Sequence, residues 1–584
     1  MLKSKVSLIV AVIVIASMML ASCAPAAPAT EAEPETIVVT QIVEVEKEVI
    51  KEVEVIKEVA ASDEFTDEDK FGGTFIFGAQ ATELPGVSPI HNNNGDEIRV
   101  YQMATEPLTW GGENFPPEVR PILAKSWEVS EDGLTWTVHL EEGVTWQDGV
   151  PFTADDVIFW ASVLEDPETV GVSSFSQRFF VNDKPYVFEK VDDYTVTITS
   201  DVPVPSLLGN IGVPIIPKHY FEENGIANKD MKASPFNNDL ALGTGPFKMV
   251  ENRVGEAVIL ERYEDYWRGR PYLDSFVFRL IPDAQTRIAA LKTGEIDFAR
   301  IQPKQVPELL SSPDIKILNL LVDYQDHLRL NVTKPNLADK RTRQAMMFAL
   351  DRLAILQVME FGYGQVADSP FNPIVTAYEP TDTYSYDVEK ANALLAEVGW
   401  EKGADGFLVA KNVEGVAPGT KFTVVLDAMD ADETKCFAMV QSYWQAVGID
   451  AQIRQIDSSV WREENSGKED KPYDVMFSGK GFVGDNGVNW DNVMASTRKD
   501  STSSYENPVT IDLFNQARAA TDVATRDEFL KQAAAIIWED LPYIPLWYQS
   551  RVWAYNTRVH LEEADFQVGM VGYFGRPDLL WVEK

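Results

Sequence analysis

Beyond its first 70 residues the chain alternates between two hydrophobic patterns, one typical of strands and one typical of amphipathic helices. In residues 134–140 every second side chain is apolar, which predicts a strand with one buried face. His139 falls on the polar phase of that strand, so we interpret it as a solvated side chain rather than a ligand. In residues 386–399 the apolar side chains recur at helical spacing instead, between Asp387 as N-cap and Gly399 as terminator. The two patterns together predict a mixed α/β body.

Short polar signals mark where other elements begin and end. Asp339 precedes a second apolar stripe at helical spacing, for which we expect one buried face formed by Met346, Ala349, Leu350 and Leu353. Gly133 closes a tight turn before the alternating strand. Thr153 is placed to cap a helix that begins one residue later.

The first 22 residues have the pattern of a secretory signal peptide. Lys3 and Lys5 precede an almost unbroken apolar run that ends in Leu-Ala-Ser-Cys. That ending resembles the lipobox of bacterial lipoproteins, in which the Cys thiol receives a diacylglyceryl group and becomes the first residue of the mature chain. We therefore expect Cys23 to be lipidated and to hold the protein on the extracytoplasmic side of a cell membrane. The alternative is an uncleaved anchor, although the run is about as short as the ~17-residue lower limit for a spanning helix.

Residues 23–70 are predicted to be the lipidated Cys and an acidic spacer. Pro, Ala and Glu dominate residues 24–36, a composition that buries no core. Residues 37–59 mix Val and Ile with Glu and Lys at spacings that suit both a helix and a strand. We favour a spacer with partial helix there, while strand and disorder remain open. An acidic run at residues 61–70 ends the linker.

Composition and charge narrow the class of protein. The 584 residues include 51 Lys and Arg against 91 Asp and Glu, so the formal charge is 51 − 91 = −40. A nucleic-acid partner is disfavoured, because binding a polyphosphate needs a basic surface. With 45% hydrophobic residues the chain is globular in composition, and its length allows about three structural units.

Motifs for metal, cofactor or catalytic chemistry are missing from the sequence. Two cysteines cannot form a disulfide framework or a zinc cluster, and the five histidines are widely scattered. We find no GxSxG, GxxxxGK(S/T) or HExxH motif and no GxGxxG that opens a helix. We therefore expect a protein without metal or cofactor that is not an enzyme.

The most specific motifs of the chain lie in seven segments, at residues 124–157, 214–219, 243–248, 260–274, 281–297, 328–335 and 341–352. Together these segments resemble the extracellular solute-binding proteins of ABC importers, specifically the peptide/nickel type called family 5. The similarity runs from about residue 72 to the C-terminus, in the order of the family. Most residues in these motifs are interpreted as turn and scaffold residues.

The resemblance implies a two-lobed α/β fold of the type II periplasmic-binding-protein kind, with an extra subdomain in lobe I. Ligand is enclosed between the lobes when they close about crossing hinge strands. The expected divisions are a signal peptide at 1–22, the lipidated Cys and spacer at 23–70, lobe I at 71–325 with the subdomain at about 100–240, lobe II at 326–545, and a return to lobe I at 546–584.

Residues 480–492 resemble the segment in which dipeptide- and oligopeptide-binding relatives place an Asp that pairs with the α-ammonium of the peptide. On that match the carboxylate is Asp485, with Asn486 beside it as a second ligand-binding residue. A carboxylate in a cleft holds an ammonium group through a charge-assisted hydrogen bond that contributes about 1.5–3 kcal/mol. The alternative is a bare turn, because Asp-Asn and Asn-Gly readily adopt positive φ.

Three aromatic side chains are candidates for the walls of the ligand pocket. Trp461 and Phe482 lie where peptide-binding relatives place aromatic walls, and Trp490 is a third candidate. The chain departs from the family pattern at Val488-Asn489, where relatives have Asp-Pro or Glu-Pro. The departure leaves the cargo open, because aromatic faces stack on sugar rings as well as on peptide side chains.

These observations predict a lipid-anchored, monomeric substrate-binding protein that captures a short peptide and delivers it to ABC permease subunits in the membrane. The first alternative keeps the machinery and changes the cargo to an oligosaccharide. Nickel or haem is a weaker alternative, because no histidine cluster marks a site. A non-transport envelope lipoprotein, motivated by the long tether, is the alternative of a different class.

Overall fold

The computed structural model describes residues 37–38, 56–57 and 65–584, with gaps at 85, 91–94, 111–118, 167–175, 182–183, 238–241, 382, 465–472, 482–504, 563, 565 and 568–572. The chain divides into two compact units, residues 1–66 and 67–584. In the first unit, β1 (Ile37–Val38) pairs antiparallel with β2 (Ile56–Lys57). These four residues form strands, the alternative left open for residues 37–59, and the rest of that segment lies outside the described residues. The β-branched side chains of Ile37, Val38 and Ile56 suit a pleated ladder.

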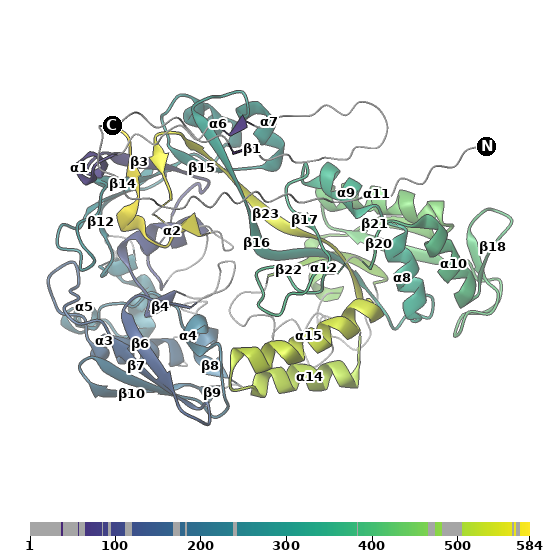
Figure 1. Ribbon diagram of the computed structural model, residues 1–584, viewed down its shortest axis with the longest axis horizontal. Helices are drawn as coiled ribbons and strands as arrows, with labels where there is room; N and C mark the ends of the chain where they lie inside the picture. The colour runs from purple at the N-terminus through teal and green to yellow at the C-terminus, as the bar shows by residue number, and fades with distance from the viewer. Residues whose placement is uncertain are drawn as a thin grey trace, which may run out of the picture. The chain divides into compact units, whose positions relative to one another are not determined.

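An 11-stranded mixed sheet runs through the second unit (Figure 1). Its order is β12-β13-β14-β3-β15-β23-β16-β22-β20-β21, and β17 pairs with β23 beside that path. The shorter strands are β3 (Thr74–Ala79), β12 (Phe247–Arg253), β13 (Ala257–Arg262), β14 (Ser275–Leu280), β15 (Phe298–Ile301), β17 (Gln365–Val366), β20 (Thr423–Ala428), β21 (Asp450–Gln455) and β22 (Val475–Gly481). The two long ones, β16 (Ile315–Leu330) and β23 (Tyr543–Asn556), are called the hinge strands below.

The hinge strands join two lobes. Residues 315–321 of β16 pair with residues 550–556 of β23, which also pairs with β15. Further along, residues 324–330 of β16 pair with β22. We call the β15 side lobe I and the β22 side lobe II, and each side buries its own cluster of apolar side chains. The predicted two-lobed α/β fold is confirmed.

The extra subdomain of lobe I surrounds a second, four-stranded antiparallel sheet. Its strands, in sheet order, are β10 (Val187–Asp192), β11 (Thr195–Thr199), β7 (Thr135–Leu140) and β6 (Ala124–Val129). Along β7 the residues Trp136, Val138 and Leu140 are at most 7% exposed, so the predicted alternation is confirmed. His139 lies on the opposite face, partly buried. Thr153 forms the predicted cap of α3 (Ala154–Glu165), in a capping box with Asp156.

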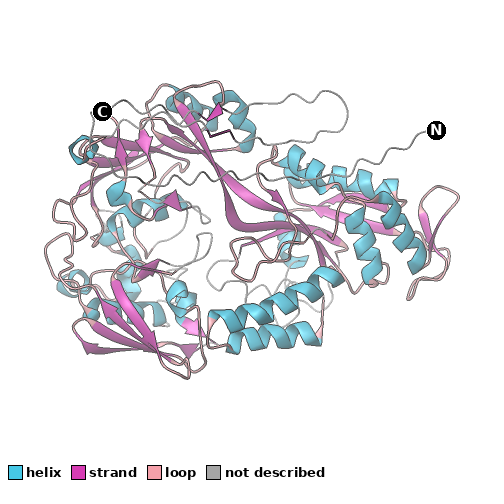
Figure 2. Cartoon of the chain, in the orientation of Figure 1, coloured by secondary structure: helices cyan, strands magenta, loops and turns pink. Residues whose placement is uncertain are grey.

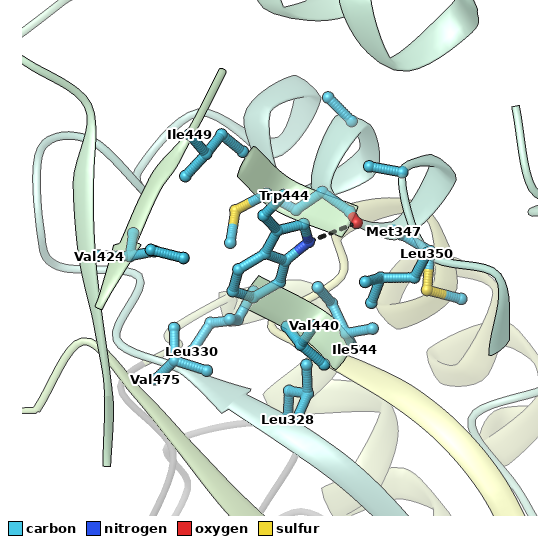
Figure 3. Close-up of a cluster of buried hydrophobic side chains, with 14 of the residues drawn as sticks. Leu328, Leu330, Met347, Leu350, Val424, Val440, Trp444, Ile449, Val475 and Ile544 are labelled. Atoms are coloured by element: carbon cyan, nitrogen blue, oxygen red, sulfur yellow. Dashed lines mark hydrogen bonds between the residues drawn. The ribbon is translucent and has the colours of Figure 1, made fainter. Parts of the chain in front are cut away.

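Helices pack beside the sheet of lobe II (Figures 1 and 2), and its core contains side chains of both helices and strands. They are α8 (Lys340–Phe348), α9 (Arg352–Met359), α10 (Val388–Val398), α11 (Ala431–Ala446), α14 (Pro508–Ala519) and α15 (Val523–Asp540). Asp387 and Gly399 bound α10 as the sequence predicts, with Gly399 in the left-handed region at φ 110°. Figure 3 shows Trp444 of α11 at the centre of the core, where its Nε1 donates to the Met346 carbonyl at 2.9 Å.

The predicted buried stripe after Asp339 is correct only in part. Asp339 caps α8 and Met346 is fully buried, but the helix stops before Ala349. Asp351 then caps a new helix, α9, by accepting from the backbone N–H of Ala354 at 2.9 Å. The break changes the helical phase, so Leu353 is 56% exposed rather than part of the buried face. The expectation failed because it assumed one continuous helix through Asp351, which in fact caps a new one.

The two lobes also meet far along the chain from the hinge strands. Gly133, at φ +71° in the turn before β7, lies beside Thr521 in the connection between α14 and α15. A Cβ placed on Gly133 would lie 3.3 Å from Thr521 Cγ2 and 3.2 Å from Pro203 Cβ. The subdomain of lobe I therefore contacts the helical pair of lobe II.

The remaining elements are short connections and edge pairs. They are α1 (Asp67–Lys70), α2 (Gly95–Ala104), α4 (Leu207–Asn210), α5 (Lys218–Glu223), α6 (Ala284–Lys292), α7 (Val306–Leu309), α12 (Ser458–Glu464), β4 (Thr109–Trp110), β5 (Arg120–Pro121), β8 (Phe180–Val181), β9 (Lys184–Pro185), β18 (Trp400–Lys402), β19 (Leu408–Ala410), β24 (Val559–His560), β25 (Phe566–Gln567), β26 (Tyr573–Phe574) and β27 (Trp581–Val582). Within the part of the chain described, no helix has the length and apolar character needed to cross a membrane.

Candidate ligand site at the hinge strands

Two arginines of the motif at residues 341–352 hold the scaffold together. Arg343 donates to the carbonyls of Leu337 at 2.8 Å and Leu541 at 2.9 Å, joining the start of α8 to the end of α15. Arg352 donates to the carbonyls of Pro545 and Tyr384, both at 3.0 Å. Buried carbonyls need such donors where regular ladders stop. The interpretation of these motif residues as scaffold is confirmed.

The pairing of the two hinge strands is interrupted where they cross from one lobe to the other. Their register shifts between Leu321 and Gln325, and again between Asp326 and His327. The fully buried Asn372 holds the irregular stretch, because its Nδ2 donates to the Val322 carbonyl at 2.8 Å. A register shift bends a strand and changes the direction of its side chains. The interruption therefore brings polar side chains to the crossing point.

A buried carboxylate, Asp326, lies at this crossing point. It is 4% exposed and accepts a hydrogen bond from Gln549 Nε2 of β23 at 2.7 Å. The other end of the same amide, Oε1, accepts from Arg551 Nη1 at 2.9 Å. Burial, and to a smaller extent the nearby Glu360, raises the pKa of Asp326 to about 7, while Gln549 and Arg551 oppose the shift. One amide thus links an acid and a base across the hinge strands.

Lobe I contributes a group of basic side chains to the same region. Arg99 of α2 is 7% exposed and forms an ion pair with Asp96 of the same helix. Its guanidinium carbon lies 5.2 Å from the ring centroid of Trp553 on β23. Arg300 of β15 is also close, because its Cα partner on β23 is this same Trp553. Burial and the charges of Arg551 and Arg99 lower the pKa of Arg300 to about 9. This side of the site is therefore cationic.

Lobe II contributes an acidic side chain instead. Glu360 follows the end of α9 and is partly buried. Burial raises the pKa of Glu360, and the Arg551 guanidinium opposes that shift. We call the seven side chains Asp96, Arg99, Arg300, Asp326, Glu360, Gln549 and Arg551 the hinge cluster. Its positive charges come mainly from lobe I, and the acids Asp326 and Glu360 come from the crossing and lobe II. This arrangement suits a ligand with charges of both signs.

An aromatic side chain, Tyr324, borders the hinge cluster. Its ring packs on β22 at Gly479, where a Cβ would lie 2.6 Å from Tyr324 Cζ and Oη. Only glycine leaves room for the ring at that strand position. The Cα partner of Tyr324 in the ladder is Gly481, the last described residue before the segment with the predicted ligand contacts.

The predicted site residues are only partly within the described chain. Phe482, Asp485, Asn486 and Trp490 lie outside the described residues, as does Cys23. Trp461 is described and lies partly buried on α12. Its indole Nε1 is buried and makes no hydrogen bond to the described part of the protein. Among the described residues, no hydrogen bond, ion pair or ring contact joins Trp461 to the hinge cluster.

Sequence reasoning missed the hinge cluster altogether. Asp326, Gln549 and Arg551 are polar residues inside long strands that are otherwise mostly apolar, and Arg300 stands within the buried strand Phe298–Ile301. A charged side chain in a buried strand lowers stability unless it is paired within the protein or binds a ligand. That pattern was visible in the sequence, but the pairing of residues more than 200 positions apart was not.

A pocket of about 420 Å³ lies elsewhere, within lobe II. Phe348, Tyr384 and Trp538 are among its lining residues, which come from α8, α10, α15 and the connection before α10. None of its lining residues belongs to the hinge cluster, so the two sites are separate. Groups of three or more side chains able to hold a metal ion are absent from the described residues.

Comparison with known proteins identifies the class. The family model of bacterial extracellular solute-binding proteins, family 5 middle, matches residues 118–501. The dipeptide-binding protein of Escherichia coli is 30% identical over 460 residues, which cover 73% of this chain and 80% of that protein. Haem-binding protein A of Haemophilus influenzae is 28% identical over 451 residues, which cover 74% of this chain and 79% of that protein.

A solved structure agrees with these relatives. The ABC transporter substrate-binding protein CtaP of Listeria monocytogenes has a TM-score of 0.75 at 26% identity, covering 88% of this chain and 100% of that one. The chain belongs to the bacterial extracellular solute-binding proteins of family 5. It is a binding protein of that family and not an enzyme, as the sequence predicts.

Proposed function

We propose that this protein captures a short peptide between its two lobes and delivers it to ABC permease subunits. The observation that carries the proposal is the hinge cluster, in which arginines of lobe I and β23 lie near acids at the crossing and in lobe II. A short peptide is a zwitterion, so it fits a site with both signs of charge. The dipeptide-binding relative supports the same cargo.

The segment after β22 supplies the remaining contacts in this proposal. Asp485 pairs with the α-ammonium of the peptide and Asn486 hydrogen-bonds beside it. Phe482, Trp490 and Trp461 form the aromatic walls of the pocket. Main-chain hydrogen bonds along the extended ligand supply affinity that does not depend on its side chains.

The protein reaches its partners by a lipid anchor. Cys23 carries the lipid after removal of residues 1–22, and the spacer up to residue 70 lets a monomer move between ligand and permease. Lobe I at 71–325, lobe II at 326–545 and the return at 546–584 then close as two bodies about the hinge strands. Replacement of Cys23 by Ala should abolish fatty-acid labelling and release the protein from membranes.

The proposal is tested by identifying the cargo that the protein retains. The full chain is purified in detergent without added ligand and denatured, and the released small molecules are identified by mass spectrometry. A ladder of short peptides supports peptide import. Release of an oligosaccharide would instead support the alternative in which the cargo is a sugar. The final column buffer serves as the blank.

Haem is a second candidate cargo, because haem-binding protein A is similar over 74% of this chain. Released porphyrin, visible by its absorption, would favour it over a peptide. Small-angle scattering separates both candidates from a non-transport lipoprotein. Contraction of the particle on adding ligand supports a transport protein, and an unchanged particle supports the other class.

A further inference from the structure

Arg300 occupies an unusual position for a charged side chain. It lies on β15, whose neighbours Phe298, Ala299 and Ile301 are at most 3% exposed. The strand is flanked by β3 on one side and by β23 on the other, where Arg300 pairs with Trp553. The guanidinium is therefore held at the surface of the lobe I core, beside the hinge strands.

The surroundings of Arg300 are dominated by other cations. Its Cα partner on β23 is Trp553, whose ring centroid lies 5.2 Å from the guanidinium carbon of Arg99, and Arg551 stands two residues before Trp553 on the same strand. Paired residues and every second residue of a strand share a face, so Arg300, Arg551 and Arg99 lie on the same face of the sheet. Like charges gathered in a partly buried region destabilise one another. The region carries an excess of positive charge.

The neighbouring groups are already engaged with one another. Asp96 Oδ2 accepts from the backbone N–H groups of Gln80 and Ala81, both at 2.8 Å, and Asp96 Oδ1 pairs with Arg99. Arg287 donates to the carbonyls of Ile281 at 2.6 Å and Pro282 at 2.8 Å. Asp96 thus has little acceptor capacity left for a second guanidinium.

Arg300 itself has no such engagement. No hydrogen bond or ion pair of its guanidinium to any described residue is found, although its backbone carbonyl accepts from Gln80 Nε2 at 3.3 Å. A guanidinium has five N–H donors in a planar fork that matches a carboxylate. Leaving such a group partly buried beside other guanidiniums, with no acceptor among the residues that the structure describes, is unfavourable, so the arrangement favours a bound anion.

We propose that Arg300 binds the carboxylate of the ligand, at the lobe I side of the hinge cluster. The inference rests on the proposed capture of a short peptide, and it sets the orientation of that peptide. Its carboxylate lies toward Arg300 of lobe I and its ammonium toward the acids of the other lobe. The ligand class is therefore a molecule with a free carboxylate, and an amide or ester at that position is disfavoured.

The test compares two pools of casein-derived di- to pentapeptides, one with free carboxylates and one with carboxylates converted to methyl esters. The full chain in detergent, stripped of ligand by dialysis from denaturant, is incubated with each pool, and bound peptides are measured by mass spectrometry. We expect the unchanged protein to retain free-acid peptides at least tenfold more than esters. Arg300→Gln should lower free-acid binding about 10- to 100-fold and remove the preference.

A matched control and a stability measurement separate binding from a structural role. Arg279→Gln removes an exposed guanidinium of β14 that pairs with Glu295 at 3.0 Å, and it should leave both pools unaffected. Without ligand, Arg300→Gln should melt at the same or a higher temperature, because it removes repulsion between cations. A lower melting temperature of the ligand-free variant would mean that a carboxylate of the protein pairs with Arg300, and it overturns the inference.

The remaining outcomes distinguish this inference from the function on which it rests. Equal retention of acids and esters by the unchanged protein and by Arg300→Gln would overturn the role of Arg300 and leave peptide capture standing. Retention of neither pool by the unchanged protein would overturn both together.

Discussion

Gln549 donates from Nε2 to Asp326 Oδ2 at 2.7 Å, joining the two hinge strands by a side-chain bond where their register is broken. The bond gives a nearly fully buried carboxylate a hydrogen-bond donor. It also couples Asp326 to Arg551, because the same amide accepts from that guanidinium. The stability of the crossing point therefore depends on a side-chain interaction between the two strands that join the lobes.

Removing the amide should destabilise the protein. Gln549→Ala leaves the Asp326 carboxylate without this donor in a buried position, so we expect the free energy of unfolding to fall by about 1–3 kcal/mol. Urea denaturation measures the change. In an Asp326→Asn background, Gln549→Ala should lower the free energy of unfolding by clearly less. An equal loss in both backgrounds would show that Gln549 and Asp326 are not coupled.

Asp326 also predicts how stability depends on pH. Its folded pKa of about 7 lies above the value near 4 of an unfolded Asp, so the folded state holds the extra proton between those pH values. Stability from this group is therefore highest below about pH 4 and decreases as the pH rises toward 7. From pH 5 to pH 8 the melting temperature should therefore fall more for the unchanged protein than for Asp326→Asn. An equal fall for both proteins would contradict the raised pKa of Asp326.

Gly479 should tolerate no side chain beside Tyr324. Gly479→Ala places a methyl group within 2.6 Å of Tyr324 Cζ, so either the ring or β22 must move. We expect a loss of about 1–3 kcal/mol in stability. Gly209→Ala is the matched control, since its nearest contact would be 3.5 Å from Val119 Cγ2. Tyr324→Ala should rescue Gly479→Ala, and a double variant as unstable as the single one would refute steric conflict.

The contact between Gly133 and Thr521 predicts a variant that opens the lobes without damaging their cores. The indole introduced by Thr521→Trp has no room beside Gly133. Even a methyl group added to Gly133 would lie only 3.3 Å from Thr521 Cγ2. We expect a larger radius of gyration by small-angle scattering and weaker ligand binding, with little change in melting temperature. Val509→Trp on the 58% exposed position of α14 is the control and should change neither quantity.

The role proposed for Asp485 has its own test. Asp485→Ala should weaken the binding of a peptide with a free ammonium group by about 10- to 100-fold. This is the effect expected from losing a charge-assisted hydrogen bond of ~1.5–3 kcal/mol. Binding of the N-acetylated peptide, which has no ammonium group, should be unaffected by the substitution. Isothermal titration of both peptides makes the comparison, and an equal loss for both would assign Asp485 to the turn alone.

Local features of the fold were predictable because their causes are local. Asp387, Gly399 and Thr153 act through backbone groups within a few residues, and β7 shows its buried face through simple alternation. Leu353 marks the limit of such reasoning. Leu353 is exposed because Asp351 caps a new helix, α9, and so ends the continuous helix that the apolar spacing predicts.

The candidate site divides in the same way. Asp485 was proposed from a motif that is contiguous in the sequence, and its role remains a prediction. Arg300 and Arg551 lie 251 positions apart and are brought together by strands that neighbour each other in the sheet. Strand order and register depend on which apolar faces pack together, and neither can be read from one strand alone.

The sequence by itself determined the class of this protein, because its motifs preserve the turns, caps and carbonyl-binding arginines that one family of folds requires. Tertiary structure alone decided which charges share a site. Asp326, Gln549 and Arg551 became neighbours through the broken register of two strands, and Arg300 lost water and gained cationic neighbours through the packing of lobe I. Electrostatic interactions depend on distance in space and on burial, and those two quantities exist only once the chain has folded.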